Sequence, residues 1–135
     1  MRNLVLVVIT VLVLAGCQSK PVTGDTVATG SGSYKSISSE ELNTMLAEKD
    51  FVLINVHIPF AGDIPGTDRS IPYDQIEQDS ARLPADKSAK IVLYCRSGRM
   101  SQIAAETLVS LGYNNVWDLN GGMVAWEKAG YEIQK

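Results

Sequence analysis

Three short apolar runs constrain the fold of this chain more than any other feature. They are FVLINV (51–56), KIVLYC (90–95) and NVWDL (115–119). Such runs, rich in β-branched and aromatic residues, are typical of strands buried in a sheet. Segments with helical spacing stand between and after them. Strands that alternate with helices predict an α/β fold with a largely parallel central sheet and helices on both faces.

Helix signals flank these strands. Ser38 and Glu41 have the spacing of a capping box, which places a helix over about 39–48. Apolar residues share one helical face over 101–111, and Gly112 follows as a stop signal. The remaining predicted segments are a long loop with three prolines and two glycines, a short helix and a last short helix, at 57–72, 73–79 and 122–129.

The N-terminal residues are typical of a targeting segment. Arg2 precedes the apolar run LVLVVITVLVLA (4–15), which is shorter than the roughly 20 residues that span a bilayer. The ending LAGC resembles the lipobox of bacterial lipoproteins. This resemblance implies a signal peptide over 1–16, cleavage before Cys17, and acyl chains such as palmitate on the Cys17 sulfur. An uncleaved N-terminal membrane helix is the alternative.

The same resemblance predicts where the protein resides. A lipid anchor at Cys17 would hold it on a membrane in the cell envelope, outside the cytoplasm. Gln18 follows Cys17 in place of the Asp that often retains lipoproteins at the inner membrane. We therefore expect an outer-membrane site facing the periplasm if the host has two membranes.

Composition sets the domain limits and excludes some partners. Residues 17–33 are rich in Ser, Thr and Gly and are predicted to be the lipidated Cys17 followed by a flexible tether. One folded domain would occupy 34–135. The net charge of -3 and the absence of a basic cluster argue against nucleic-acid binding. We expect a monomer.

Cys95 ends the second predicted strand and opens a loop into a helix. Ligands bind at this edge of open parallel sheets. Backbone N–H groups of the loop 96–100 can form an anion-binding nest, to which the helix N-terminus adds. These groups, together with Arg96 and Arg99, would stabilise a thiolate, and Gly98 would permit the sharp turn. The pattern predicts a nucleophilic cysteine. The alternative is a buried structural cysteine.

The loop YCRSGRMS (94–101) resembles the active-site loop of rhodanese-like domains, in which a cysteine carries sulfur as a persulfide. FVLINVHIP with GDIPGT resembles a second family segment, and VWDLNGGMVAWEKAGYEI (116–133) resembles the family's C-terminal signature. The match extends over about 34–135. It implies that Cys95 is catalytic and that no metal or organic cofactor is required. The substrate-binding residues it implies are Arg96, Ser97, Gly98, Arg99, Met100 and Ser101.

Three positions depart from the family pattern. Asn55 stands where the family usually has Asp, and His57 stands where it has Arg. His57 is the only histidine and is expected to have a structural role in the loop. Met100 replaces the arginine that usually ends the active-site loop. Arg99, one residue earlier, is then the nearest candidate to orient an anionic donor.

The resemblance implies a sulfurtransferase. Its donor would be a small sulfur anion such as thiosulfate or a polysulfide, and its acceptor a thiol or a cyanide-like nucleophile. A non-catalytic binding or redox-sensing module is the alternative, which Asn55 and Met100 favour. A phosphatase or arsenate reductase ranks last, because Tyr94 precedes Cys95 and Ser101 stands where a phosphatase loop would have its arginine.

Overall fold

The fold is built on one six-stranded sheet with the order β1-β2-β6-β5-β3-β4. The computed structural model describes Gly16 and residues 20–135, so the predicted signal peptide 1–16, except Gly16, and Cys17 lie outside the described residues. β1 and β2 pair antiparallel, and the other neighbouring strands pair parallel. The predicted α/β fold with a largely parallel sheet is therefore confirmed. The strands are β1 Asp25–Ala28, β2 Ser33–Ile37, β3 Val52–Asn55, β4 Arg69–Ser70, β5 Ile91–Tyr94 and β6 Val116–Leu119.

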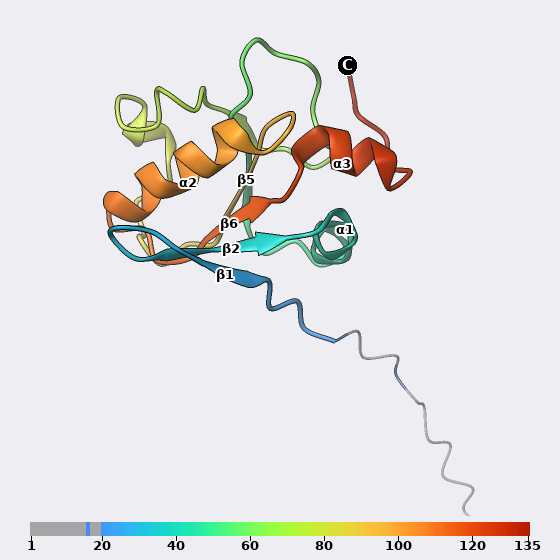
Figure 1. The fold of residues 1–135 in the computed structure, drawn as a ribbon, viewed down its shortest axis with the longest axis horizontal. Helices are drawn as coiled ribbons and strands as arrows, with labels where there is room; N and C mark the ends of the chain where they lie inside the picture. The colour runs from blue at the N-terminus through green and yellow to red at the C-terminus, as the bar shows by residue number, and fades with distance from the viewer. Residues whose placement is uncertain (1–15, 17–19) are drawn as a thin grey trace, which may run out of the picture.

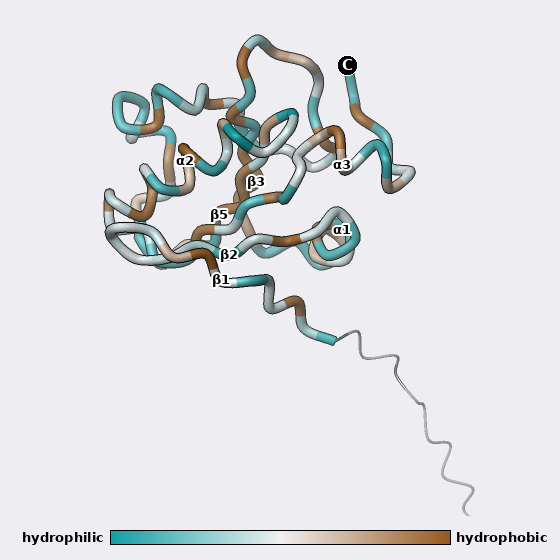
Figure 2. The backbone as a smooth tube through the Cα atoms, viewed as in Figure 1, coloured by the Kyte–Doolittle hydropathy of each residue, from teal (hydrophilic) through white to brown (hydrophobic). Residues whose placement is uncertain are grey.

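Within the described residues, three α-helices cover the two faces of the sheet (Figure 1). They are α1 Ser39–Ala47, α2 Arg99–Ser110 and α3 Gly122–Lys128. One apolar cluster lies between the sheet and α2, and includes Leu93 and Leu108. The second lies against α1 and α3, and includes Leu42 and Trp126. Figure 2 shows hydrophobic positions along β3 and β5, two neighbouring strands inside the sheet.

The helix starts follow local chemistry. The Ser38 side chain accepts the Glu41 N–H, and Glu41 accepts the Ser38 N–H, so the predicted capping box is present. α2 begins at Arg99, two residues before the predicted start. Gly98 adopts a φ of 111° and caps this helix, because a left-handed residue lets the chain turn directly from the cysteine loop into the first helical turn.

The predicted flexible tether over 17–33 is wrong for its second half. Asp25–Ala28 forms β1 and pairs with β2, which begins at Ser33, inside the predicted tether. The turn between the strands closes through a 2.8 Å hydrogen bond from the Thr29 N–H to the Gly32 carbonyl. Val27 packs against the cluster under α2, and Val22 packs against the other cluster. The segment is ordered because strand pairing satisfies its backbone and two valines bury apolar surface.

The predicted helix over 73–79 is also wrong. These residues form turns, followed by a single 3-10 turn at Ser80–Arg82. Only Ile76 in the segment is fully buried, so it lacks the apolar stripe that stabilises a short helix by packing. The loop 57–72 is irregular as predicted, except that Arg69–Ser70 forms β4 at the sheet edge. Within Gly16 and 20–135, no helix is both long and apolar enough to cross a membrane.

Candidate active site

The candidate site lies where β3, β5 and β6 end at their carboxyl edge. The segment 56–64 follows β3, Cys95 follows β5, and the Gly121–Gly122 pair follows β6. Parallel pairing of these strands brings the three connections together at one edge of the sheet. This is the position at which open α/β sheets bind ligands.

The Cys95 sulfur is enclosed by its own loop. The Gly98 N–H donates to Sγ at 3.0 Å, and Sγ lies 3.5 Å from Ser101 Oγ. Ser101 Oγ in turn donates to the Gly98 carbonyl at 3.0 Å. Cys95 is free and only 1% exposed, so a reacting molecule would meet the sulfur at the bottom of the loop. Burial alone would also suit a structural cysteine, but a backbone donor aimed at sulfur favours its anionic form.

The start of α3 fixes the outer side of this loop. The Met123 N–H donates to the Cys95 carbonyl at 2.9 Å, and the Val124 N–H donates to the Arg96 carbonyl at 2.9 Å. Gly122 has a φ of 56°, and a Cβ atom there would overlap the Cys95 carbonyl oxygen. The glycine pair therefore lets the backbone of α3 contact the cysteine loop directly.

Two residues hold the loop after β3 beside the cysteine loop. The buried Asn55 amide donates to the Gly62 carbonyl at 3.0 Å and to Asp63 Oδ1 at 2.9 Å. The Tyr94 hydroxyl accepts the Ile64 N–H at 3.0 Å. Burial raises the pKa of Tyr94, so this hydroxyl stays neutral. Asn55, which departs from the family pattern, thus keeps a hydrogen-bonding role without a charge.

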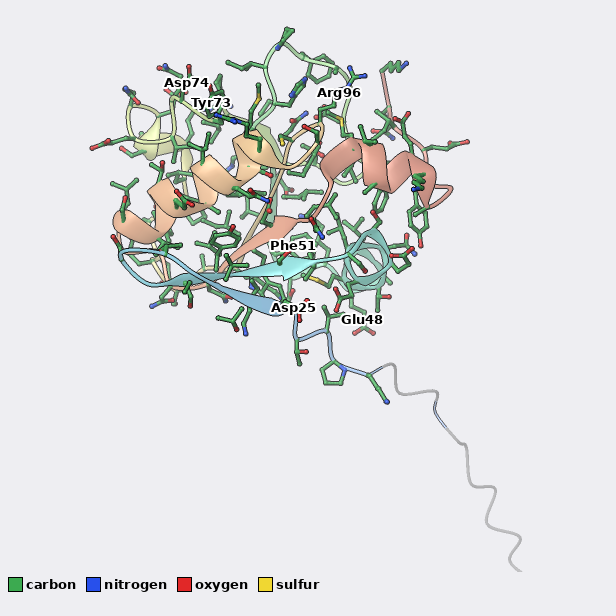
Figure 3. The ribbon with its side chains drawn as sticks, viewed as in Figure 1. Asp25, Glu48, Phe51, Tyr73, Asp74 and Arg96 are labelled. Atoms are coloured by element: carbon green, nitrogen blue, oxygen red, sulfur yellow. The ribbon has the colours of Figure 1, made fainter. Side chains whose placement is uncertain are left out.

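Arg96 and Arg99 lie in different surroundings, because only Arg96 lines the two cavities described next. Arg96 is exposed and lines two cavities, one of about 100 Å³ and one of about 380 Å³. Both cavities are also lined by Ala61 and Lys135. The larger includes the exposed Phe60, and the smaller includes Glu127. Figure 3 shows Arg96 beside the loop that follows β3. The two basic side chains make this end of the molecule suitable for an anion.

The other predicted site residues lie in different environments. Ser97 is exposed beside Arg96, and Arg99 is exposed on the first residue of α2. Met100 is half-buried and packs against the apolar cluster under α2. Ser101 is fully buried beneath Cys95. The seven residues 95–101 are therefore contiguous, but their side chains divide between the core, the solvent and the cavities.

His57 lies near the charge of Arg96. Burial lowers the pKa of His57 below its usual value, and the positive charge of Arg96 lowers it further. The imidazole is therefore neutral near pH 7. Its N–H backbone group donates to Asn55 Oδ1 at 3.0 Å, which fits the loop role expected from the sequence.

Asp118 is the site-proximal residue that sequence reasoning missed. It lies in β6, is 1% exposed, and its Oδ1 atom has no hydrogen-bond partner in the described part of the chain. Burial raises the pKa of Asp118 to about 7, and hydrogen bonding from the Ser101 side chain opposes that rise. The sequence contained a signal for it, because a carboxylate in the middle of VWDL conflicts with a buried strand.

Comparison with known proteins shows to which family this chain belongs. The sequence model of the rhodanese-like domain matches residues 38–129. The chain belongs to the rhodanese-like family. A sulfurtransferase from Allochromatium vinosum is 35% identical over 101 residues, covering 72% of this chain and 92% of that protein. A thiosulfate sulfurtransferase GlpE from Pseudoalteromonas translucida is 30% identical over 103 residues, covering 71% and 91% of the two chains.

Solved structures agree with this assignment. A rhodanese-related protein from Thermoplasma volcanium has a TM-score of 0.64 at 28% identity, covering 74% of this chain and 97% of that chain. The family match begins at residue 38, so the whole ordered hairpin of β1 and β2 precedes the matched part. The rhodanese-like resemblance drawn from the cysteine loop and the glycine pair is confirmed.

Proposed function

We propose that this rhodanese-like protein is a sulfurtransferase that carries sulfur on Cys95. The observation that carries the proposal is the 3.0 Å hydrogen bond from the Gly98 N–H to Cys95 Sγ, made at a strand end and directly before α2. A backbone donor and a helix N-terminus both stabilise negative charge on sulfur. Relatives named sulfurtransferases, at 30% and 35% identity, support the same activity.

The reaction would proceed in two displacements at sulfur. The Cys95 thiolate attacks the outer sulfur of thiosulfate, a new S–S bond forms, and sulfite leaves with the bonding electron pair. The product is a Cys95 persulfide, whose outer sulfur carries the charge. A thiolate or cyanide then attacks that sulfur and releases Cys95 as the thiolate. Loop N–H groups favour both anionic states without moving between the steps.

The donor anion would bind on the Arg96 side of the loop. Arg96 is adjacent to Cys95 in the chain, and its side chain shares two cavities with Lys135. Arg99 is exposed at the helix start and lines neither of these two cavities. We therefore assign the main donor contact to Arg96, and Arg99 a lesser one. Met100 packs with the apolar cluster and offers no charge to a donor.

Intact mass spectrometry tests the chemistry directly. The domain from residue 20 is treated with thiosulfate or polysulfide and is then weighed with and without cyanide. We expect a gain of one sulfur atom, removed by cyanide with release of thiocyanate. Cys95→Ser, which keeps the size of the side chain, should gain nothing. A mass gain in Cys95→Ser, or none in the wild type with either donor, contradicts the proposal.

A non-catalytic binding or redox-sensing module is the second candidate. The 1% exposure of Cys95 favours it, because large donors cannot reach the sulfur without movement of the loop. Met100 favours it as well, since the family's usual arginine is absent. Measuring turnover distinguishes the two candidate functions. A sulfurtransferase releases thiocyanate repeatedly, whereas a sensor would form at most one modified cysteine for each chain.

We propose further that the protein is lipid-anchored through Cys17 in the cell envelope, facing the periplasm from an outer membrane if the host has one. The support is the LAGC sequence. Residues 20–22 line a cavity with the end of α1, and Val22 packs against the core. Two residues separate Cys17 from Lys20, so the anchor would lie within about 10 Å of the folded domain.

This short connection would orient the domain. The N-terminal segment leaves near Asp25 and Glu48, and Arg96 lies at the far side of the molecule (Figure 3). Cys95 would therefore face away from the membrane that holds Cys17. Such an orientation suits a soluble sulfur donor and acceptor better than one embedded in the lipid.

A further inference from the structure

Asp118 and Cys95 lie on the same face of the sheet. β5 and β6 pair so that Leu93 is opposite Asp118, and Cys95 is two residues beyond Leu93 on the same strand path. Side chains two residues apart along a strand point to the same face. Asp118 therefore extends into the layer between the sheet and α2, on the side where the Cys95 sulfur also lies.

Ser101 stands between the two groups. Its Oγ lies 3.5 Å from Cys95 Sγ, and it donates to the Gly98 carbonyl at 3.0 Å. The hydrogen bonding of Ser101 also acts on Asp118, whose pKa it lowers against the larger effect of burial. Cys95, Ser101 and Asp118 are each no more than 1% exposed. The Ser101 hydroxyl accepts from the thiol and has one proton, which the Gly98 carbonyl accepts in this arrangement. Turning that proton from Gly98 to Asp118 would connect the thiol to the carboxyl without water.

Few other charges act on this carboxyl. Burial raises the pKa of Tyr34 in β2, and the negative charges of Asp118 and Glu106 raise it further. Arg99 and Glu106 of α2 are exposed on the solvent side of that helix. Tyr94 of β5 belongs to the opposite apolar cluster, and Lys35 of β2 donates to Thr26. Asp118 thus lacks an ion-pair partner among the described residues.

We propose that Asp118 is a positioning residue that holds the Cys95 proton, relayed through the Ser101 hydroxyl. This inference rests on the proposed sulfurtransferase function. The Ser101 O–H first turns from the Gly98 carbonyl to the Asp118 carboxylate. The Cys95 S–H proton then passes to Ser101 Oγ while the Ser101 proton passes to that carboxylate. The products are a thiolate that accepts hydrogen bonds from Ser101 and Gly98, and a neutral carboxylic acid. The pKa of about 7 suits a group that must accept and return a proton near neutrality.

The relay also completes the second displacement. When an acceptor takes the outer sulfur, Cys95 leaves as a thiolate with the electron pair of the broken S–S bond. The neutral Asp118 then returns its proton through Ser101, and the thiol is restored. No oxidant, reductant or metal is needed, because each step moves one proton or one sulfur.

Sulfur-transfer kinetics test the relay with three single variants and one double variant. Asp118→Asn keeps the shape but cannot hold the proton, and Ser101→Ala removes the bridge. We expect each to lower kcat for thiosulfate and cyanide about 100-fold, the low end for general acid–base catalysis. The double variant should also lose about 100-fold, because the residues act as one unit. Ser101→Thr, which restores the hydroxyl, should recover most of the activity. The proposal is wrong if the loss of kcat in the double variant equals the product of the two single losses, or if Asp118→Asn loses no activity.

A second readout does not depend on turnover. The rate of Cys95 alkylation by iodoacetamide is measured against pH in the wild type and in Asp118→Asn. Two coupled groups titrate in two steps, so the wild type should show a step near pH 7 that Asp118→Asn lacks. Alkylation with this step but no sulfur transfer would refute the sulfurtransferase function and keep the coupling. Identical profiles would refute the coupling alone.

Infrared spectroscopy keeps the test valid if Asp118→Asn fails to fold. The buried carboxylic acid band is titrated in the wild type and in Cys95→Ser, which leaves Asp118 in place. Removing the thiol should move the midpoint of this band by about one pH unit if the groups interact. An unchanged midpoint overturns the proposal.

Discussion

Gly122 leaves no room for a side chain beside the carbonyl oxygen of Cys95, and the next residue, Met123, donates its N–H to that same oxygen at 2.9 Å. The relationship ties the last helix to the cysteine loop through backbone alone. Any side chain at Gly122 would push the loop away from α3. The position of the Cys95 sulfur therefore depends on a glycine at position 122, which follows a different strand, β6.

Gly122→Ala should destabilise the protein by more than about 2 kcal/mol, because a φ of 56° and a backbone overlap add together. Sulfur transfer should fall even in the folded fraction, since the loop must shift. Gly112→Ala is the matched control, because Gly112 also has a positive φ, 93°, but has open space around it. Thermal unfolding of both variants measures the difference. Equal losses of stability in Gly122→Ala and Gly112→Ala would show that the overlap with the Cys95 carbonyl adds no destabilisation.

Arg96→Ala should raise the KM for thiosulfate about tenfold and change kcat less, because a charge-assisted contact to the bound donor is worth about 1.5–3 kcal/mol. Arg99→Ala, measured in parallel, should have a smaller effect, since Arg99 lines neither of the two cavities that Arg96 lines. An organic persulfide without a sulfonate group should depend on Arg96 less than thiosulfate does. A larger effect from Arg99 would return the donor contact to the position that the sequence suggests.

The parts of the fold that depend on local sequence were predictable. β3, β5 and β6 lie within the three apolar runs, and α1 begins at the capping box of Ser38. These elements are specified by residues close in the chain. The hairpin of β1 and β2 was not, because its strands are short and polar and are ordered by pairing with β6 and by contacts of Val22 and Val27. The predicted helix at 73–79 was wrong because only Ile76 in that segment is fully buried, so no apolar face stabilises a helix there by packing.

The candidate site divides in the same way. The cysteine loop and the glycine pair are each contiguous motifs, so the sequence identified both, and it placed Cys95 at the carboxyl edge of the sheet. The Asp118 carboxyl comes from a third segment, and its proximity to Ser101 follows from strand register and from the packing of α2. Sequence spacing could mark Asp118 as an anomaly in a buried strand, but it could not say which residue it would meet.

Asp118 should make the stability of the protein fall as pH rises. Its folded pKa of about 7 lies above the ordinary value of 3.8, so the folded state binds this proton more tightly than the unfolded state. The penalty is absent below pH 3.8, grows between pH 4 and 7, and then levels off, with an upper bound of about 4 kcal/mol. Asp118→Asn should make the stability depend less on pH, whereas Asp74→Asn, at an exposed position, should not. Denaturant unfolding at pH 5 and pH 8 measures it, and an unchanged slope in Asp118→Asn contradicts it.

The lipid anchor makes a prediction about distance as well as attachment. Labelled fatty acid should incorporate into the wild type but not into Cys17→Ser, which should leave the membrane fraction or remain unprocessed. Label on Cys17→Ser would exclude the anchor.

Because residues 20–22 contact the domain, a fluorophore near Glu48 should be quenched by labelled lipid, and one near Arg96 should not. Inserting ten Gly and Ser residues after Ser19 should abolish this difference while keeping the protein on the membrane, since the added chain lets the domain move tens of ångströms away. Equal quenching at both positions in the wild type would show that the ordered hairpin does not orient the domain.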